Sequence, residues 1–215
     1  MSDHAPLFLS PVEARILGVL VEKQFTTPDV YPLTANALTN GCNQKSSRDP
    51  VMTLSENEVL ASLEELRGRS LVLVTYGASG RVMRYAQNLD KVLKISRPLL
   101  SLLAALMLRG PQTPGELRVN CDRFYHFPDI SSLDAYLDEL AEWSAGAMVV
   151  KLAKQAGARE HRYAHLLSGE PDLSAVPAPR GSSNELEFLR NEVSELRRLV
   201  DHLYAELGVT EPAEG

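Results

Sequence analysis

Cysteine, tryptophan and long apolar runs are scarce in this chain of 215 residues, which contains two cysteines and one tryptophan. Cys42 and Cys121 stand 79 positions apart, so the chain has no disulfide framework and we expect both thiols to be reduced. The longest apolar run, residues 99–108, is interrupted by Ser101 and is far shorter than the roughly 20 residues of a membrane span. Residues 1–4 lack the basic start of a signal peptide. These absences predict a cytoplasmic protein with no membrane segment.

Motifs for catalysis and cofactor binding are also missing. The chain contains no P-loop, no GxGxxG and no GxSxG sequence. Cys42 has no histidine predicted beside it, so a small buried thiol is the simpler interpretation. His161 and His165 stand four apart on a predicted strand, but a zinc site there would need further ligands. We therefore expect no enzymatic activity, no metal and no cofactor.

The net charge of −6 is spread unevenly along the chain. Residues 1–90 carry a net charge of −2, residues 91–169 carry +2, and residues 170–215 carry −6. The acidity is thus concentrated in the C-terminal part, and the remainder is close to neutral. This distribution excludes a strongly basic nucleic-acid-binding protein but permits a local basic patch.

Three short matches in the same order indicate an internal duplication. Their offsets are 86, 74 and 78 positions, so the first copy is 12 residues longer before its third helix. That difference predicts an insertion of about 12 residues between the second and third helices of the first copy. The matched segments are 25–28 with 111–114, 59–66 with 133–140, and 84–86 with 162–164.

Each copy is predicted to contain three helices followed by a β-hairpin. Ser10, Ser55 and Thr113 each precede a glutamate by three positions, which is the capping-box signature of a helix start. Ser96 is expected to start the first helix of the second copy, and Asp129 or Ser131 its third. The hairpins are expected at residues 71–86, with a turn at 77–80, and at residues 148–166, with a turn near residue 157.

Three helices and a hairpin form the winged-helix arrangement, a helix-turn-helix with a β-hairpin wing. The predicted fold class is therefore α+β, mainly helical, with tandem winged-helix domains at residues 8–90 and 91–169. A linker rich in Pro, Ser and Ala follows at residues 170–183, and a coiled-coil helix follows at 184–208.

The predicted C-terminal helix carries an unbroken heptad seam. Valine at position a with leucine at position d favours a parallel two-stranded coiled coil, so we expect a parallel homodimer. The alternative is that this helix packs on the body of its own chain. The seam residues are Leu186, Leu189, Val193, Leu196, Val200, Leu203 and Leu207.

Motifs along residues 8–170 resemble the YceH-like family of uncharacterised bacterial tandem winged-helix proteins. The resemblance implies tandem winged helices and a C-terminal coiled coil, and it implies no catalytic residues. The motifs that carry it are Glu13-Ala14-Arg15, Glu22-Lys23-Gln24, Thr26-Thr27-Pro28, Tyr31-Pro32-Leu33, Cys42-Asn43-Gln44-Lys45, Arg48, Pro50-Val51-Met52, Leu54-Ser55-Glu56, Leu108-Arg109-Gly110, 112–118 and Arg162-Tyr163.

Two functions remain open from the sequence. A winged helix that reads DNA lays its third helix in the major groove, but both third helices here are acidic. One function is therefore a dimeric DNA-associated or regulatory protein that contacts nucleic acid through its wings and the Lys45–Arg48 loop. The other is a protein-assembly module, like acidic tandem winged-helix accessory subunits. The candidate nucleic-acid contacts are Lys45, Arg48, Arg81, Arg84, Lys151, Lys154 and Arg159.

The stretch from Asn40 to Met52 occurs only in the first copy and has two interpretations. In the structural one, residues 50–52 pack the loop on the core while Asn43 and Gln44 bond to the backbone. In the functional one, Lys45 and Arg48 supply the phosphate contact that the acidic third helix cannot make. Arg84 and Arg162, repeated in Arg-Tyr-Ala, fit a structural role in which the tyrosine packs on the core and the arginine pairs with an acidic helix.

Overall fold

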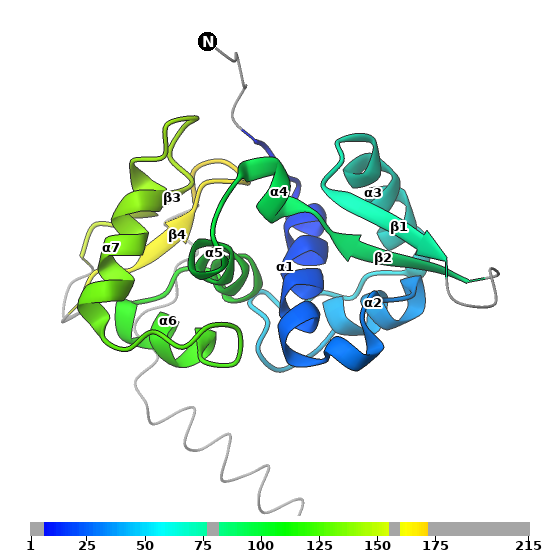
Figure 1. Ribbon diagram of the computed structural model, residues 1–215, viewed down its shortest axis with the longest axis horizontal. Coiled ribbons are helices and arrows are strands. Elements are labelled where there is room, and N and C mark those ends of the chain that lie inside the picture. Colours follow the sequence, from blue (N-terminus) through cyan, green and yellow to red (C-terminus); the bar gives the residue numbers. More distant parts are fainter. Residues whose placement is uncertain (1–6, 77–81, 155–159, 172–215) are drawn as a thin grey trace, which may run out of the picture. The chain divides into compact units, whose positions relative to one another are not determined.

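The computed structural model describes residues 7–76, 82–154 and 160–171, and Figure 1 shows their arrangement. The chain divides into two compact units, residues 1–173 and 174–215. The described segments all belong to the first unit. The predicted linker and coiled-coil helix, the turns at 77–80 and 157, and Arg81 and Arg159 lie outside the described residues.

The first half contains three helices and a hairpin, as predicted. It comprises α1 (Pro11–Thr26), the short 3-10 helix η1 (Pro28–Val30), α2 (Ala35–Cys42), α3 (Glu56–Gly68), β1 (Val72–Tyr76) and β2 (Met83–Gln87). The predicted capping boxes are confirmed at Ser10 with Glu13 and at Ser55 with Glu58. Each satisfies backbone N–H groups that have no partner inside the helix.

The second half repeats this order after a short helix that the sequence reasoning missed, α4 (Leu89–Leu93). Its elements are α5 (Arg97–Arg109), α6 (Pro114–Cys121), α7 (Ile130–Ala141), β3 (Val149–Lys151) and β4 (Tyr163–His165). Thr113 and Glu116 form a capping box at α6, and Asp129 rather than Ser131 caps α7. The described part of the chain is thus mainly helical with two small antiparallel sheets.

The two halves share details that go beyond the order of their elements. The repeated tyrosines, Tyr85 and Tyr163, are buried and bridge to Leu33 and Gln112, which precede α2 and α6. Arg84 donates to the carbonyl oxygen of Pro32 at 2.8 Å, and Arg162 donates to that of Pro111 at 2.8 Å. Both repeated arginines therefore hold the same turn. The buried tyrosines agree with the structural role expected for this motif. The expected pairing with an acidic helix holds for Arg162, which pairs with Glu116 of α6, but was wrong for Arg84, which bonds to carbonyl oxygens.

The helix starts correct the predicted position of the extra residues in the first half. The caps of the first helices, Ser10 and Ser96, are 86 positions apart, whereas those of the second, Thr34 and Thr113, are 79 apart. The caps of the third helices are 74 apart. Seven of the 12 extra residues thus lie between α1 and α2, where η1 is found. Only the other five extra residues lie between α2 and α3. The prediction of a 12-residue insertion there was wrong, because three matched positions could not locate the second helix.

Helices α1 and α5 pack against each other in the middle of the unit and join its two halves (Figure 1). Apolar side chains of both halves form one continuous core, and the residue boundary expected at 90/91 lies inside α4. Gly18 permits the close contact, because a Cβ atom there would stand 2.9 Å from Cγ of Leu108 and 3.4 Å from Cβ of Met107. Of the described helices, none is long and apolar enough to cross a membrane.

Replacing Gly18 with alanine should therefore destabilise the protein. The added methyl group must push Leu108 aside, and such overpacking typically costs about 1–3 kcal/mol of unfolding free energy. Gly68→Ala in α3 is the matched control, because nothing lies within 4 Å of a Cβ atom there. Urea denaturation should show a lower midpoint for Gly18→Ala, and an unchanged or raised midpoint for Gly68→Ala. Equal midpoints for the two variants would contradict the tight α1–α5 contact.

Candidate functional site

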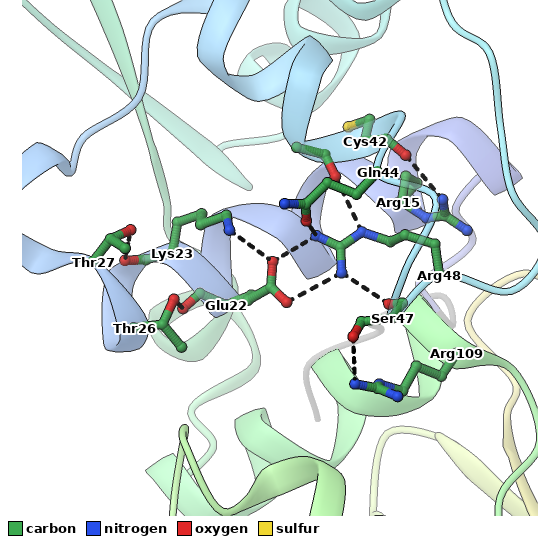
Figure 2. A network of polar contacts seen from close by, with 11 residues as sticks. Arg15, Glu22, Lys23, Thr26, Thr27, Cys42, Gln44, Ser47, Arg48 and Arg109 are labelled. Atoms are coloured by element: carbon green, nitrogen blue, oxygen red, sulfur yellow. Dashed lines mark hydrogen bonds and ion pairs between the residues drawn. The ribbon is translucent and has the colours of Figure 1, made fainter. Parts of the chain in front are cut away.

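The loop that connects α2 to α3 is built around the guanidinium group of Arg48 (Figure 2). The Arg48 side chain is fully buried and forms a bidentate ion pair with Glu22 of α1, at 3.1 and 2.5 Å. It also donates to the carbonyl oxygens of Gly41 and Ser47 and to the side chain of Gln44. The fork of five N–H donors on arginine suits such a site, where a lysine could fill only part of it.

A second buried arginine connects the end of α2 to the middle of the same loop. Arg15 of α1 donates to the carbonyl oxygen of Cys42 at 3.0 Å and to that of Pro50 at 2.6 Å. Burial, and then the nearby charge of Arg48, lower the pKa of Arg15. Two guanidinium groups thus lie close together beneath the loop and bind carbonyl oxygens of the loop and of the end of α2. That arrangement fixes the backbone of the loop and leaves neither group available at the surface.

The loop also reaches the second half. The backbone N–H of Asp49 donates to the carbonyl oxygen of Leu108 at 2.8 Å, and Arg109 donates to the hydroxyl of Ser47 at 2.7 Å. Ser47 adopts a positive φ of 60°, which turns its carbonyl toward Arg48 and its hydroxyl toward Arg109. The loop is therefore a connector between α1, α2 and the end of α5, as Figure 2 shows for the labelled side chains.

Asn43 closes the loop in the manner expected from the sequence. Its side chain donates to the carbonyl oxygen of Leu54 at 2.8 Å and accepts from the N–H of Leu54 at 2.7 Å. Gln44 instead bonds to the Arg48 side chain, and Val51 is exposed rather than packed on the core. Asn43 thus meets the structural interpretation. The predicted contacts of Gln44, Pro50 and Val51 were wrong, because Pro50 is exposed as well, and of residues 50–52 only Met52 is half-buried.

Arg48 does not occupy the position that a nucleic-acid contact requires. Because its side chain is buried and every nitrogen donates to the protein, its placement disagrees with the functional interpretation. Arg84 is likewise directed to the carbonyl oxygens of Val30 and Pro32. Lys45, Lys151 and Lys154 are exposed, and Lys151 lies 5.8 Å from the ring centre of Tyr163. The structure does not gather those candidate residues that it describes into one site.

Most described arginines are engaged within the protein. Their partners are carboxylates, as in Arg69 with Glu13 and Arg162 with Glu116, or carbonyl oxygens, as in Arg97 with Phe124. The engaged set is Arg15, Arg48, Arg67, Arg69, Arg84, Arg97, Arg109, Arg118 and Arg162. Arginine, the side chain best suited to phosphate, is therefore used mainly to fix loops in this fold.

Acidic side chains are exposed on α3, and apolar side chains are exposed on the neighbouring first hairpin. On α3 the exposed acidic residues are Glu56, Glu58, Glu64 and Glu65. On the hairpin Leu73, Tyr76, Val82 and Met83 are exposed by 48%, 66%, 48% and 47%. Several large apolar side chains on one short hairpin, beside a negatively charged helix, are typical of a surface that binds another protein.

The cysteines and histidines do not assemble into a reactive site. Cys42 and Cys121 are buried, and burial raises the pKa of each thiol to about 12. His161 lies before β4 rather than on it and bonds to the carbonyl of Leu152, whereas burial lowers the pKa of His165 to about 4. Within the described ranges, no group of three or more His, Cys, Asp or Glu side chains could hold a metal ion.

Sequence reasoning missed Glu22 and Arg15 as parts of the loop site. Glu22 lies 26 positions before Arg48, on a helix whose other face is in the core, and no local pattern links the two residues. The only local sign of this network was Arg48 itself, because an arginine in a loop between two helices can bond to the loop backbone. Long-range ion pairs of this kind become visible only when the packing of the helices is known.

These features define a duplicated, mainly helical α+β protein whose most polar loop has a structural role. The chain belongs to the family described as "Protein of unknown function, DUF480", which matches residues 9–158. It is 47% identical to a UPF0502 protein of Cupriavidus metallidurans, over 97% of this chain and 90% of that protein. It is 50% identical to one of Leptothrix cholodnii, over 94% and 96%. The bacterial family indicated by the motifs is thereby confirmed.

Arg48→Ala should unfold the loop and strongly destabilise the protein. Removing one member of a buried ion pair typically costs about 3–5 kcal/mol of unfolding free energy. Here it also removes the hydrogen-bond donor of two carbonyl oxygens and of the Gln44 side chain. Glu22→Gln should cost less, because Arg48 keeps its carbonyl partners, and Arg48→Lys should not restore stability. Thermal and urea denaturation of the full chain measure these differences.

Lys45→Ala is the control for the loop site. Lys45 is exposed in the same loop, so its removal should change the unfolding free energy by less than about 0.5 kcal/mol. A double-mutant cycle between Glu22 and Arg48 should give a coupling energy of about 1 kcal/mol or more. A stable Arg48→Ala variant with no coupling to Glu22 would show that the network does not hold the loop.

Proposed function

We propose that this chain is a non-enzymatic tandem winged-helix module that assembles with another protein. Each half has the content of a winged helix, with three helices, a hairpin, and a segment before the second helix that bridges to the hairpin. The observation that carries the proposal is the use of the arginines, because most of the described ones bind partners within the chain, Arg67 as an exposed pair with Glu64, while the third helices present further carboxylates. Such a surface repels phosphate and suits a basic protein partner.

DNA binding through the wings and the Lys45–Arg48 loop is the weaker candidate. Two of the expected contacts, Arg48 and Arg84, are committed to internal partners. Lys45 lies on the α2–α3 loop, and Lys151 and Lys154 lie on the second hairpin segment, so the exposed lysines come from different halves. With few phosphate contacts, the electrostatic part of nucleic-acid affinity would be small.

Site-specific crosslinking in living bacterial cells tests the nature of the partner. A photoreactive amino acid at Glu65, on the exposed acidic side of α3, should give a discrete crosslinked product that protease removes and nuclease does not. The matched control is Arg123, which is exposed in the second half, after α6. The purified chain should also leave random duplex DNA unshifted at about 50 mM salt.

Two results would overturn this function. The first is a nuclease-sensitive product at Glu65. The second is DNA binding that weakens steeply with salt and is lost when Lys45, Lys151 and Lys154 are replaced together by glutamate.

We also propose that residues 184–208 join two copies of the chain. The support is the heptad seam, whose valine and leucine positions favour a parallel dimer. Leu196→Asp places a charge in the centre of that seam and should yield a monomer in light scattering, while the full chain has the mass of a dimer. Ser194→Asp, at position b of the same heptad and so outside the seam, is the control and should leave the mass unchanged. A monomeric full chain would refute the dimer.

A further inference from the structure

The first hairpin has a strand edge that the structure leaves without a backbone partner among the described residues. β2 is the central strand, because it pairs with β1 on one side and bridges to Leu33 on the other. The N–H and C=O of Tyr85 both bond to Leu33, at 2.8 and 3.1 Å. Tyr85 therefore directs its backbone groups away from β1, and its neighbours on β2 supply the bonds within the hairpin.

The same alternation tells which groups of β1 face outward. Val74 pairs with Tyr85 in the register, and Tyr76 pairs with Met83, so both belong to the pairs that lack hairpin bonds. Their N–H and C=O groups point away from β2 and have no partner among the described residues. Val72, at the start of the strand, is buried, whereas Tyr76 is 66% exposed. The accessible edge thus runs from Val74 to Tyr76.

Proteins usually protect such an edge, and the second half of this chain does so. There the residue paired with the repeated tyrosine is Lys151, opposite Tyr163, and β3 is only three residues long. In the first half the equivalent residue is Val74, opposite Tyr85, in a five-residue strand, Val-Leu-Val-Thr-Tyr, without charge or proline. Lysine at an edge position opposes strand addition, and an uncharged β-branched edge favours it.

The charge beside this edge indicates the chemistry of the strand that would bind. Helix α3 packs against β1, and its carboxylates include Glu64, which pairs with Arg67 at 2.6 Å. Burial first, and then Glu64, raise the pKa of the neighbouring Tyr85, while Arg67 lowers it. An added strand beside β1 would lie close to Glu64, on the helix that also exposes Glu65. Successive side chains of a strand alternate between its two faces, so Val74 and Tyr76 share one face and Leu73 lies on the other. Basic side chains on the Val74 and Tyr76 face would meet the carboxylates, and apolar side chains on the opposite face would meet Leu73.

We infer that the β1 edge binds an extended peptide segment with alternating apolar and basic side chains, by β-strand addition. This inference rests on the proposed function, since it names the class of protein segment and the place where it binds. A second copy of the chain fits this edge less well, because it would bring two acidic α3 helices together. The main-chain bonds would give affinity, and the neighbouring carboxylates would select for lysine or arginine.

The test uses the full chain and a synthetic peptide of about eight residues with alternating lysine and valine. At saturation, hydrogen exchange of the Val74 and Tyr76 amides should slow by about tenfold or more. The Thr75 amide already lies on the hairpin side and should change little. A peptide of alternating glutamate and valine should not bind. Protection that is absent from β1, or equal binding of the two peptides, would overturn the inference.

Two variants separate strand addition from simple charge attraction. Val74→Lys introduces the lysine that the second half has at Lys151, and a variant with a native circular dichroism spectrum should bind the peptide at least tenfold more weakly. Val74→Pro removes an outward N–H and adds no charge, so a folded variant should show a similar loss. Because Val74 is half-buried against the core, Val74→Ala is the control for lost packing and should keep its affinity for the peptide. Undiminished binding to a folded Val74→Pro variant would refute strand addition. In that case a protein crosslink at Glu65 would still support the proposed function, and only the strand-addition inference would fail.

Discussion

The buried ion pair between Arg48 and Glu22 is the constraint on which the middle of this structure depends. A guanidinium group withdrawn from water is stable only when its donors are satisfied, and here a carboxylate, two carbonyl oxygens and an amide meet that need. Each of these acceptors belongs to the loop, to α1 or to the end of α2. The need to satisfy one charge therefore fixes three segments at once.

The consequence of that constraint extends to the second half. Once Arg48 holds the carbonyl of Ser47, the Ser47 hydroxyl and the Asp49 N–H are presented to Arg109 and Leu108 of α5. The close approach of α1 and α5 at Gly18 lies in the same region of the core. The polar loop and the apolar helix pair thus support one contact between the halves, and the extra residues of the first half provide the connector.

Local features of the sequence predicted local structure well. Serine or threonine followed by glutamate located three helix starts, and the repeated Arg-Tyr-Ala located the second strand of each hairpin, because these signals act within a few residues. The partner of Arg48 could not be predicted, since Glu22 reaches it only through the packing of α1 against the loop. The seven extra residues before α2 were missed for a related reason: the sequence matches gave a total length difference but did not mark where α2 begins.

The two copies share their internal contacts but differ at the surface. Both halves use an arginine to pin a prolyl carbonyl and a tyrosine to close the core, so the internal requirements are the same. At the edge of the hairpin the two halves differ, because one has Val74, which is half-buried and packs against the core, and the other has the exposed Lys151. Core packing accounts for the valine side chain, whereas the outward N–H and C=O of Val74 have no partner among the described residues. The side chain thus serves the fold of the first half, and the backbone edge is the part that its fold leaves unused.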